Sequence, residues 1–164
     1  MGLRKILTDK DPSLHKVCRP VEKFDGRLHK LLDDMVETMQ DAHGVGLAAP
    51  QIGILRRVVV VDTGDGVLEL VNPTLLETSG EELGPEGCLS VPGKYGLVKR
   101  PYYAKVRAQD RNGDWFEPKA RRSLPAASAT SWITWKGSSI PRLWNASCWT
   151  KNWTSATKRD KASP

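Results

Sequence analysis

The chain has 164 residues, a formal net charge of +6 and three cysteines at wide, irregular spacing. This length suits one domain with its own core, and the odd number of cysteines argues against a disulfide framework and for a reducing, cytoplasmic compartment. The N-terminus lacks the apolar core of a secretion signal, and no apolar run approaches the roughly 18–20 residues that span a bilayer, so we expect a soluble protein with no membrane partner.

The excess positive charge is confined to the end of the chain. Residues 118–164 hold nine Lys or Arg, one acid and five of the six tryptophans, whereas residues 1–117 carry a net charge of −2. A basic tail with tryptophans leaves nucleic acid open as a partner, but the basic residues are scattered. We therefore predict no specific nucleic-acid binding.

The first predicted element is an amphipathic helix over residues 26–42. Asp25 is suited to cap its start, and Gly44 is expected to end it at the left-handed position. Apolar side chains recur at helical spacing with charged residues on the opposite face, namely at Leu28, Leu31, Leu32, Met35 and Met39. This helix is expected to pack on the core through its apolar face.

The segments that follow change to the periodicity of strands. Strands are predicted at 57–61, 67–71, 103–108 and 115–117. Turn residues at 62–66 join the first two, and the hairpin-prone pair Asn112-Gly113 joins the last two. The predicted fold class is α+β, an N-terminal amphipathic helix packed with an antiparallel β-meander.

The stretch GVGLAAPQIG at residues 44–53 is rich in glycine. It superficially matches a dinucleotide fingerprint, but that motif follows a strand and opens a helix, whereas this one follows a helix. Gly44 and Gly46 instead permit a sharp exit from the helix and close approach of a ligand's backbone. Gln51 is then either a carboxamide hydrogen-bond donor held on a constrained segment, or a solvated side chain in a glycine-rich connection between a helix and a strand.

A second dense motif, EGCLSVPG at residues 86–93, places Cys88 between glycines and a proline. GVGLAAPQIG followed by EGCLSVPG closely resembles the peptide deformylase family over residues 1–117. The resemblance implies a metal-dependent amide hydrolase that removes the formyl group from the N-terminal methionine of nascent bacterial proteins. Its partners would be N-formylmethionyl peptides and, at the start of a nascent chain, the ribosome.

The resemblance also implies roles for single residues. Cys88 matches the thiolate ligand of one Fe²⁺ or Zn²⁺ ion, which activates water in this family. Gln51 and the backbone N–H of Leu89 match the two donors to the formyl oxygen. The substrate-binding positions are matched by Val45, Gly46 and Gly87, with strand addition expected along Val45 and Gly46.

The family's two histidine ligands and its general base come from an H-E-x-x-D-H helix, and this sequence contains no such motif. Its only histidines are His15, His29 and His43, all before Cys88. One ligand cannot hold a catalytic metal. The metal-binding C-terminal helix is therefore absent or disrupted, and we expect the chain as written to be inactive and not to retain the ion.

Our hypothesis for the missing helix is a shift of reading frame near residues 117–120, either genuine or a sequencing error. Read from the third base of each codon, the stretch ATSWITWKG at 129–137 can encode H-E-L-D-H-L-E-G. Two junctions are forced by the genetic code: Trp132–Ile133 must give Asp, and Trp135–Lys136 must give Glu. We thus divide the chain into a deformylase-like body, 1–117, and an aberrant tail, 118–164, either out of frame or disordered.

Three other functions remain open from the residues alone. The body could be a non-catalytic peptide-binding relative, which predicts formyl-peptide binding without metal. The gene could be a decayed pseudogene. A cysteine hydrolase using Cys88 and His43 is a further alternative, although nothing in the sequence indicates a partner to orient the histidine.

Overall fold

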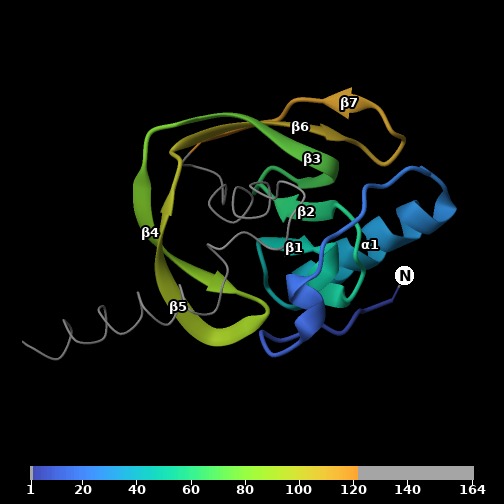
Figure 1. The fold of residues 1–164 in the computed structure, drawn as a ribbon, viewed down its shortest axis with the longest axis horizontal. Helices are drawn as coiled ribbons and strands as arrows, with labels where there is room; N and C mark the ends of the chain where they lie inside the picture. The colour runs from blue at the N-terminus through green and yellow to red at the C-terminus, as the bar shows by residue number, and fades with distance from the viewer. Residues whose placement is uncertain (1, 122–164) are drawn as a thin grey trace, which may run out of the picture.

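The computed structural model describes residues 2–121 (Figure 1). Its elements are η1 (Pro12–His15), α1 (Gly26–Asp41), β1 (Gly46–Ala48), η2 (Ala49–Ile52), β2 (Val58–Asp62), β3 (Val67–Ser79), β4 (Glu82–Cys88), β5 (Val91–Arg100), β6 (Tyr103–Gln109), β7 (Trp115–Phe116) and β8 (Lys119–Arg121). The predicted α+β class is confirmed. No helix in this part of the chain is both long and apolar enough to cross a membrane.

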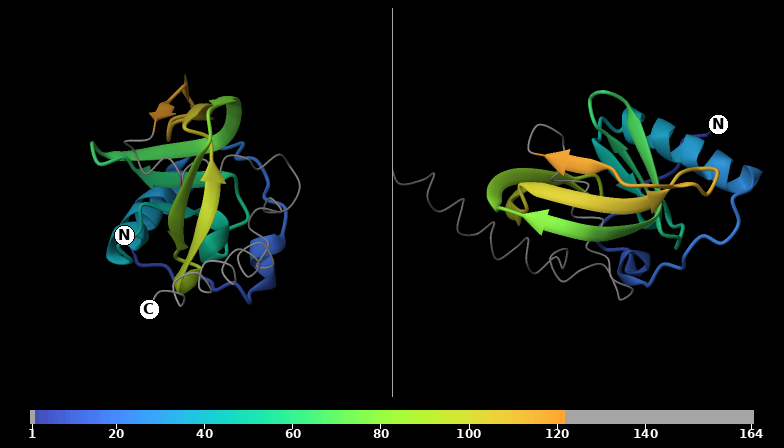
Figure 2. Two further views of the ribbon diagram at one scale, coloured as in Figure 1. Left: turned by 90° about the vertical axis from the view of Figure 1, so that its left-hand side faces the viewer. Right: turned by 90° about the horizontal axis from the view of Figure 1, so that it is seen from above.

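The strands form two antiparallel sheets. The larger has the order β1-β2-β3-β6-β7, with β8 also paired to β6, and the smaller consists of β4 and β5. The β4–β5 ribbon curves away from the larger sheet on the side away from the start of α1 (Figures 1 and 2). All four predicted strands are present, but no strand was predicted between residues 72 and 100, where β3 ends and this ribbon lies.

Helix α1 forms because both its start and its apolar face match the sequence pattern. The Asp25 carboxylate accepts hydrogen bonds from the backbone N–H groups of Arg27 and Leu28. The apolar face is buried against β1 and β2 in a core with Leu47, Val58, Val60 and Val71. A second apolar cluster, which includes Val59, Leu70 and Val106, lies on the other face of the sheet.

The end of α1 corrects one expectation. The left-handed residue is His43, with φ of 51°, and not Gly44. His43 N donates to Gln40 O and Gly44 N donates to Met39 O, at 3.0 and 2.9 Å, which is the Schellman pattern with histidine in the position usually taken by glycine. Gly44 is one residue beyond the left-handed position and is required for a different reason, a close approach by Leu89.

We expect His43→Gly to raise the free energy of unfolding by about 0.5–1 kcal/mol. Glycine relieves the strain of a side chain at positive φ, and the extra freedom of glycine in the unfolded chain offsets part of that gain. The His43 side chain is exposed, so little packing is lost. Chemical denaturation measures the change; Gln40→Gly within the helix is the control and should lose about 0.5–1 kcal/mol. A destabilised His43→Gly protein would contradict the assignment of strain.

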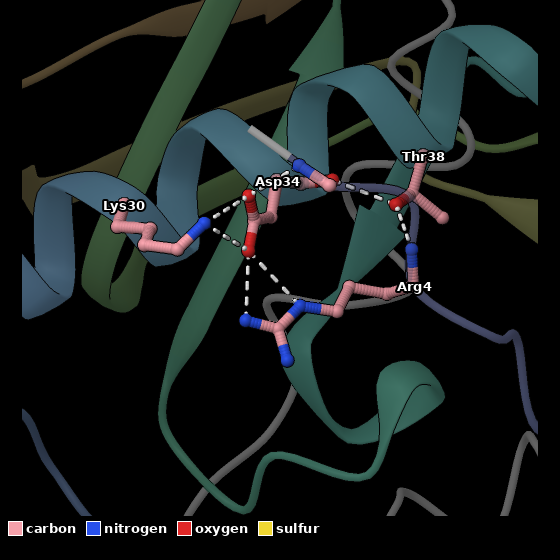
Figure 3. Close-up of polar contacts among 5 residues, drawn as sticks. Arg4, Lys30, Asp34 and Thr38 are labelled. Atoms are coloured by element: carbon pink, nitrogen blue, oxygen red, sulfur yellow. Dashed lines mark hydrogen bonds and ion pairs between the residues drawn. The ribbon is translucent and has the colours of Figure 1, made fainter.

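An ionic network fixes the N-terminal segment to α1 (Figure 3). The Asp34 side chain is 1% exposed. Arg4 donates to Asp34 Oδ2 from Nε and Nη2, at 3.0 and 2.7 Å, and Lys30 Nζ lies 3.1 Å from Oδ1. Thr38 Oγ1 accepts from Arg4 N at 2.9 Å. These bonds hold Arg4 against α1. The residues that follow Arg4 contact the motifs at residues 44–53 and 86–93 through backbone hydrogen bonds.

Candidate functional site

The fold brings together the two motifs that the sequence singled out. Gln51 lies on η2, directly after β1, and Cys88 is the last residue of β4. Gln51 Nε2 is 3.7 Å from Cys88 Sγ, although 37 residues separate them in the chain. The candidate site is therefore the junction between the larger sheet and the β4–β5 ribbon.

Gln51 is held at both ends of its carboxamide. Ala48 N donates to Gln51 Oε1 at 3.0 Å, and Gln51 Nε2 donates to Ser90 Oγ at 3.0 Å. A backbone N–H can only donate, so the oxygen faces Ala48 and the nitrogen faces Cys88. Because Gln51 is 2% exposed, the alternative of a solvated glutamine is wrong.

The Cys88 thiol has no histidine partner in the part of the chain that the structure describes. Its sulfur accepts from Ser90 N at 3.3 Å and from Gln51 Nε2. Burial raises the pKa of Cys88 to about 12, against weaker opposing hydrogen bonds from Ser90 and Val91. A nucleophilic cysteine needs to form its thiolate. A buried thiol with a raised pKa and no histidine partner among the described residues therefore argues against the Cys88–His43 hydrolase.

Leu89 and Gly44 fit together closely. A Cβ on Gly44 would lie 2.6 Å from Leu89 Cδ1, with the other nearest atoms also in the Leu89 side chain. A side chain at position 44 would therefore displace Leu89, whose backbone N–H is one of the two expected donors. Close packing by the Leu89 side chain explains this glycine, whereas the sequence predicted the close approach of a ligand's backbone.

Val45 and Gly46 lie at an open edge of the larger sheet. Strand β1 pairs only with β2 among the described strands. Asp62 N donates to Val45 O at 3.0 Å. Since hydrogen-bonded residues alternate along an antiparallel pair, the N–H and C=O of Gly46 point away from β2, toward the open edge. The Val45 side chain is exposed there as well.

Gly87 lies on the ribbon, one residue before Cys88, and is exposed. A Cβ at Gly87 would lie 3.1 Å from the ring of Tyr95, its partner across β4 and β5. The predicted site residues thus come from one region: Gln51 beside Cys88, Leu89 against Gly44, and Gly87 adjacent to Cys88.

The residues present do not by themselves fit the metal ion that the resemblance implies. Within residues 2–121, no three His, Cys, Asp or Glu side chains are grouped so that they could hold a metal. Beyond that range the sequence adds only Cys148 and Asp160 of these types. Cys88 is a single ligand of the expected set.

Two features of the site were not identified from the sequence. Ser90, 1% exposed, lies between Gln51 and Cys88. The N-terminal segment contacts both motifs through its backbone, because Leu7 N donates to Gln51 O at 2.7 Å and Asp9 N donates to Ser90 O at 2.9 Å. Backbone contacts leave no residue-type signal, whereas a serine two residues after Cys88 could have been noted.

Comparisons with known proteins identify the family of the chain. A family model, polypeptide deformylase, matches residues 3–126. The chain is 51% identical over 127 residues to a peptide deformylase of Alkaliphilus metalliredigens and 53% identical over 127 residues to one of Clostridium botulinum, each match covering 77% of this chain and 86% of the relative. A crystal structure of peptide deformylase from Thermotoga maritima superimposes with a TM-score of 0.78 at 36% identity, covering 81% of this chain and 90% of that one. The chain therefore belongs to the polypeptide deformylase family.

Proposed function

We propose that residues 2–121 form the peptide-recognition part of a peptide deformylase, and that the chain as written binds N-formylmethionyl peptides without hydrolysing them. The observation that carries this proposal is the Gln51 carboxamide, whose nitrogen faces Cys88 Sγ at 3.7 Å next to the open edge of β1. An amide donor beside an unpaired strand edge suits a formylated peptide in extended form.

Each contact follows from the chemistry of such a ligand. A formyl oxygen accepts hydrogen bonds, and Gln51 Nε2 and Leu89 N are the proposed donors. The free N–H and C=O of Gly46 pair with the peptide backbone, with Val45 and the exposed Gly87 at its sides. Because this ligand begins a nascent chain, the ribosome in a bacterial cytoplasm is a proposed further partner.

Hydrolysis requires groups that this sequence lacks. In the family, one Fe²⁺ or Zn²⁺ ion supplies the activated water, held by a thiolate and two histidines. Cys88 is the only such ligand placed at the site among residues 2–121, and no H-E-x-x-D-H motif follows it. The family match extends past the predicted boundary at residue 117 to residue 126, a stretch that includes β8. It does not include residues 127–164, which supports our proposal that this part of the tail is out of frame.

Purified protein of verified mass tests both parts of the proposal. The ligand is formyl-Met-Ala-Ser; calorimetry or NMR titration measures binding, and formate release measures turnover. We expect saturable binding without turnover. Absence of binding would overturn the recognition function, whereas formate production that a chelator abolishes would overturn the predicted inactivity. The same tripeptide without its formyl group is the matched control and should bind more weakly.

Resequencing genomic DNA across the codons for Trp115 to Trp153 tests the frame. An inserted or deleted base that restores H-E-L-D-H would give a metal-dependent deformylase. Confirmation of the written frame would instead leave an inactive, decayed relative.

A further inference from the structure

Ser90 is more deeply buried than either residue that it joins across the two motifs. It is 1% exposed and lies in the turn between β4 and β5. Each of its polar atoms has a partner: its carbonyl accepts from Asp9 N, its N–H donates to Cys88 Sγ, and its hydroxyl accepts from Gln51 Nε2.

The hydroxyl accepts from Gln51 Nε2 and donates to the Cys88 sulfur, and these two bonds account for its burial. Burying a hydroxyl without a hydrogen bond is unfavourable, so alanine would suit this position if packing alone decided the residue. The backbone bonds of Ser90 would remain with alanine, because they involve only its N–H and C=O. The hydroxyl is therefore explained by its bonds to Gln51 and Cys88, through which it holds the Gln51 carboxamide beside the sulfur.

The two hydrogen bonds of Gln51 have different effects. The bond from Ala48 N to Oε1 holds the oxygen end of the carboxamide against β1. The bond from Nε2 to Ser90 Oγ holds the nitrogen end, so that the two bonds together with the covalent link at Cδ fix the plane of the group. One N–H is used in this bond, and the other is directed to the region beside Cys88, where the sulfur is a weak acceptor at 3.7 Å.

We propose that Ser90 is a positioning residue, which sets the plane of the Gln51 carboxamide and directs its second N–H at the carbonyl oxygen of a bound formyl group. The consequence for a ligand rests on the proposed function; the effect on Gln51 does not. Asp9 N in turn holds the Ser90 backbone, so the N-terminal segment supports the same arrangement.

Hydrogen exchange of the Gln51 side-chain amide tests the positioning without any ligand. In the unchanged protein we expect the Nε2 proton bound to Ser90 to exchange at least about tenfold more slowly than the other, because a buried hydrogen bond must open first. In Ser90→Ala the two rates should become similar, and Ser90→Thr, which keeps the hydroxyl, should restore the difference. Equal rates in the unchanged protein would overturn the proposal, even if a variant fails to fold.

Titration with formyl-Met-Ala-Ser tests the consequence for binding. Loss of one well-directed donor should weaken binding by about fivefold in Ser90→Ala, with the affinity regained in Ser90→Thr. The affinity for the tripeptide without its formyl group should not change. Unchanged affinity for the formylated peptide in Ser90→Ala would contradict the role in recognition. If the unchanged protein shows the exchange difference but binds no formyl peptide, the proposed function fails and the positioning of Gln51 stands.

Discussion

Replacement of Asp34 by alanine is expected to lower the free energy of unfolding by about 2 kcal/mol at neutral pH. Removal of one partner from a buried ion pair costs about 3–5 kcal/mol, but Arg4 and Lys30 are largely exposed and recover hydration, so the lower figure applies. The variant also removes the acceptor for Gly2 N at 2.9 Å. Equilibrium denaturation measures the loss.

The same residue predicts how stability depends on pH. Burial tends to raise the pKa of Asp34, but hydrogen bonds from Arg4, Lys30 and Gly2 N outweigh it and lower the pKa from 3.8 to about 2. A carboxyl with a lower pKa in the folded state stabilises the protein above its unfolded pKa. This contribution is complete above about pH 4 and is lost as the pH falls toward 2. The gap in stability between the unchanged protein and Asp34→Ala should therefore narrow over that interval.

Asp41→Ala is the matched control for this prediction. Asp41 is the last residue of α1 and its side chain is exposed. A carboxylate at the C-terminal end of a helix is unfavourable, so its removal should change stability by no more than about 0.5 kcal/mol. A similar loss in both variants would show that the network around Asp34 contributes nothing specific.

Gln51→Leu is expected to remove formyl-peptide binding and to destabilise the fold. Leucine has nearly the same volume but leaves Ala48 N without its acceptor and Ser90 Oγ without its donor. Each buried polar group that loses its partner costs about 1–3 kcal/mol, so we expect a total loss of about 2–4 kcal/mol. Binding of formyl-Met-Ala-Ser should weaken at least about tenfold, because the proposed oxygen donor is gone.

Thermal unfolding and titration at a temperature where the variant remains folded separate the two effects. Gln40→Leu, on the exposed side of α1, is the control and should change neither stability by more than about 0.5 kcal/mol nor the affinity. Tight binding by folded Gln51→Leu protein would exclude Gln51 as a donor to the ligand.

The sequence predicted α1 well because the signals for a helix are local. Apolar spacing and the Asp25 cap lie within the helix itself, and the predicted range of 26–42 differs from the observed Gly26–Asp41 by one residue. The end was less predictable. Gly44 has the residue type of a helix stop, but its glycine is required by the Leu89 side chain, which comes from a segment 45 residues away.

The β4–β5 ribbon could not be predicted from its own residues. Gly84, Pro85 and Gly87 interrupt any strand pattern in β4, and glycine and proline are ordinarily depleted in strands. The pairing of Glu82 with Arg100 through Gly87 with Tyr95 supplies the order that local propensity does not. Strand formation here depends on a partner strand, whereas a helix satisfies its hydrogen bonds within itself.

The family and the lack of an H-E-x-x-D-H motif follow from the residue types and their order in the chain. The same order predicts Gln51, Cys88 and Leu89 as site residues. The fold was needed to show that Gln51 is buried with its nitrogen toward Cys88, that Ser90 joins the two motifs, and that the backbone of Leu7 and Asp9 supports them. The hydrogen bonds of a side chain depend on which groups from distant parts of the chain lie next to it, and the packing of the fold determines those neighbours.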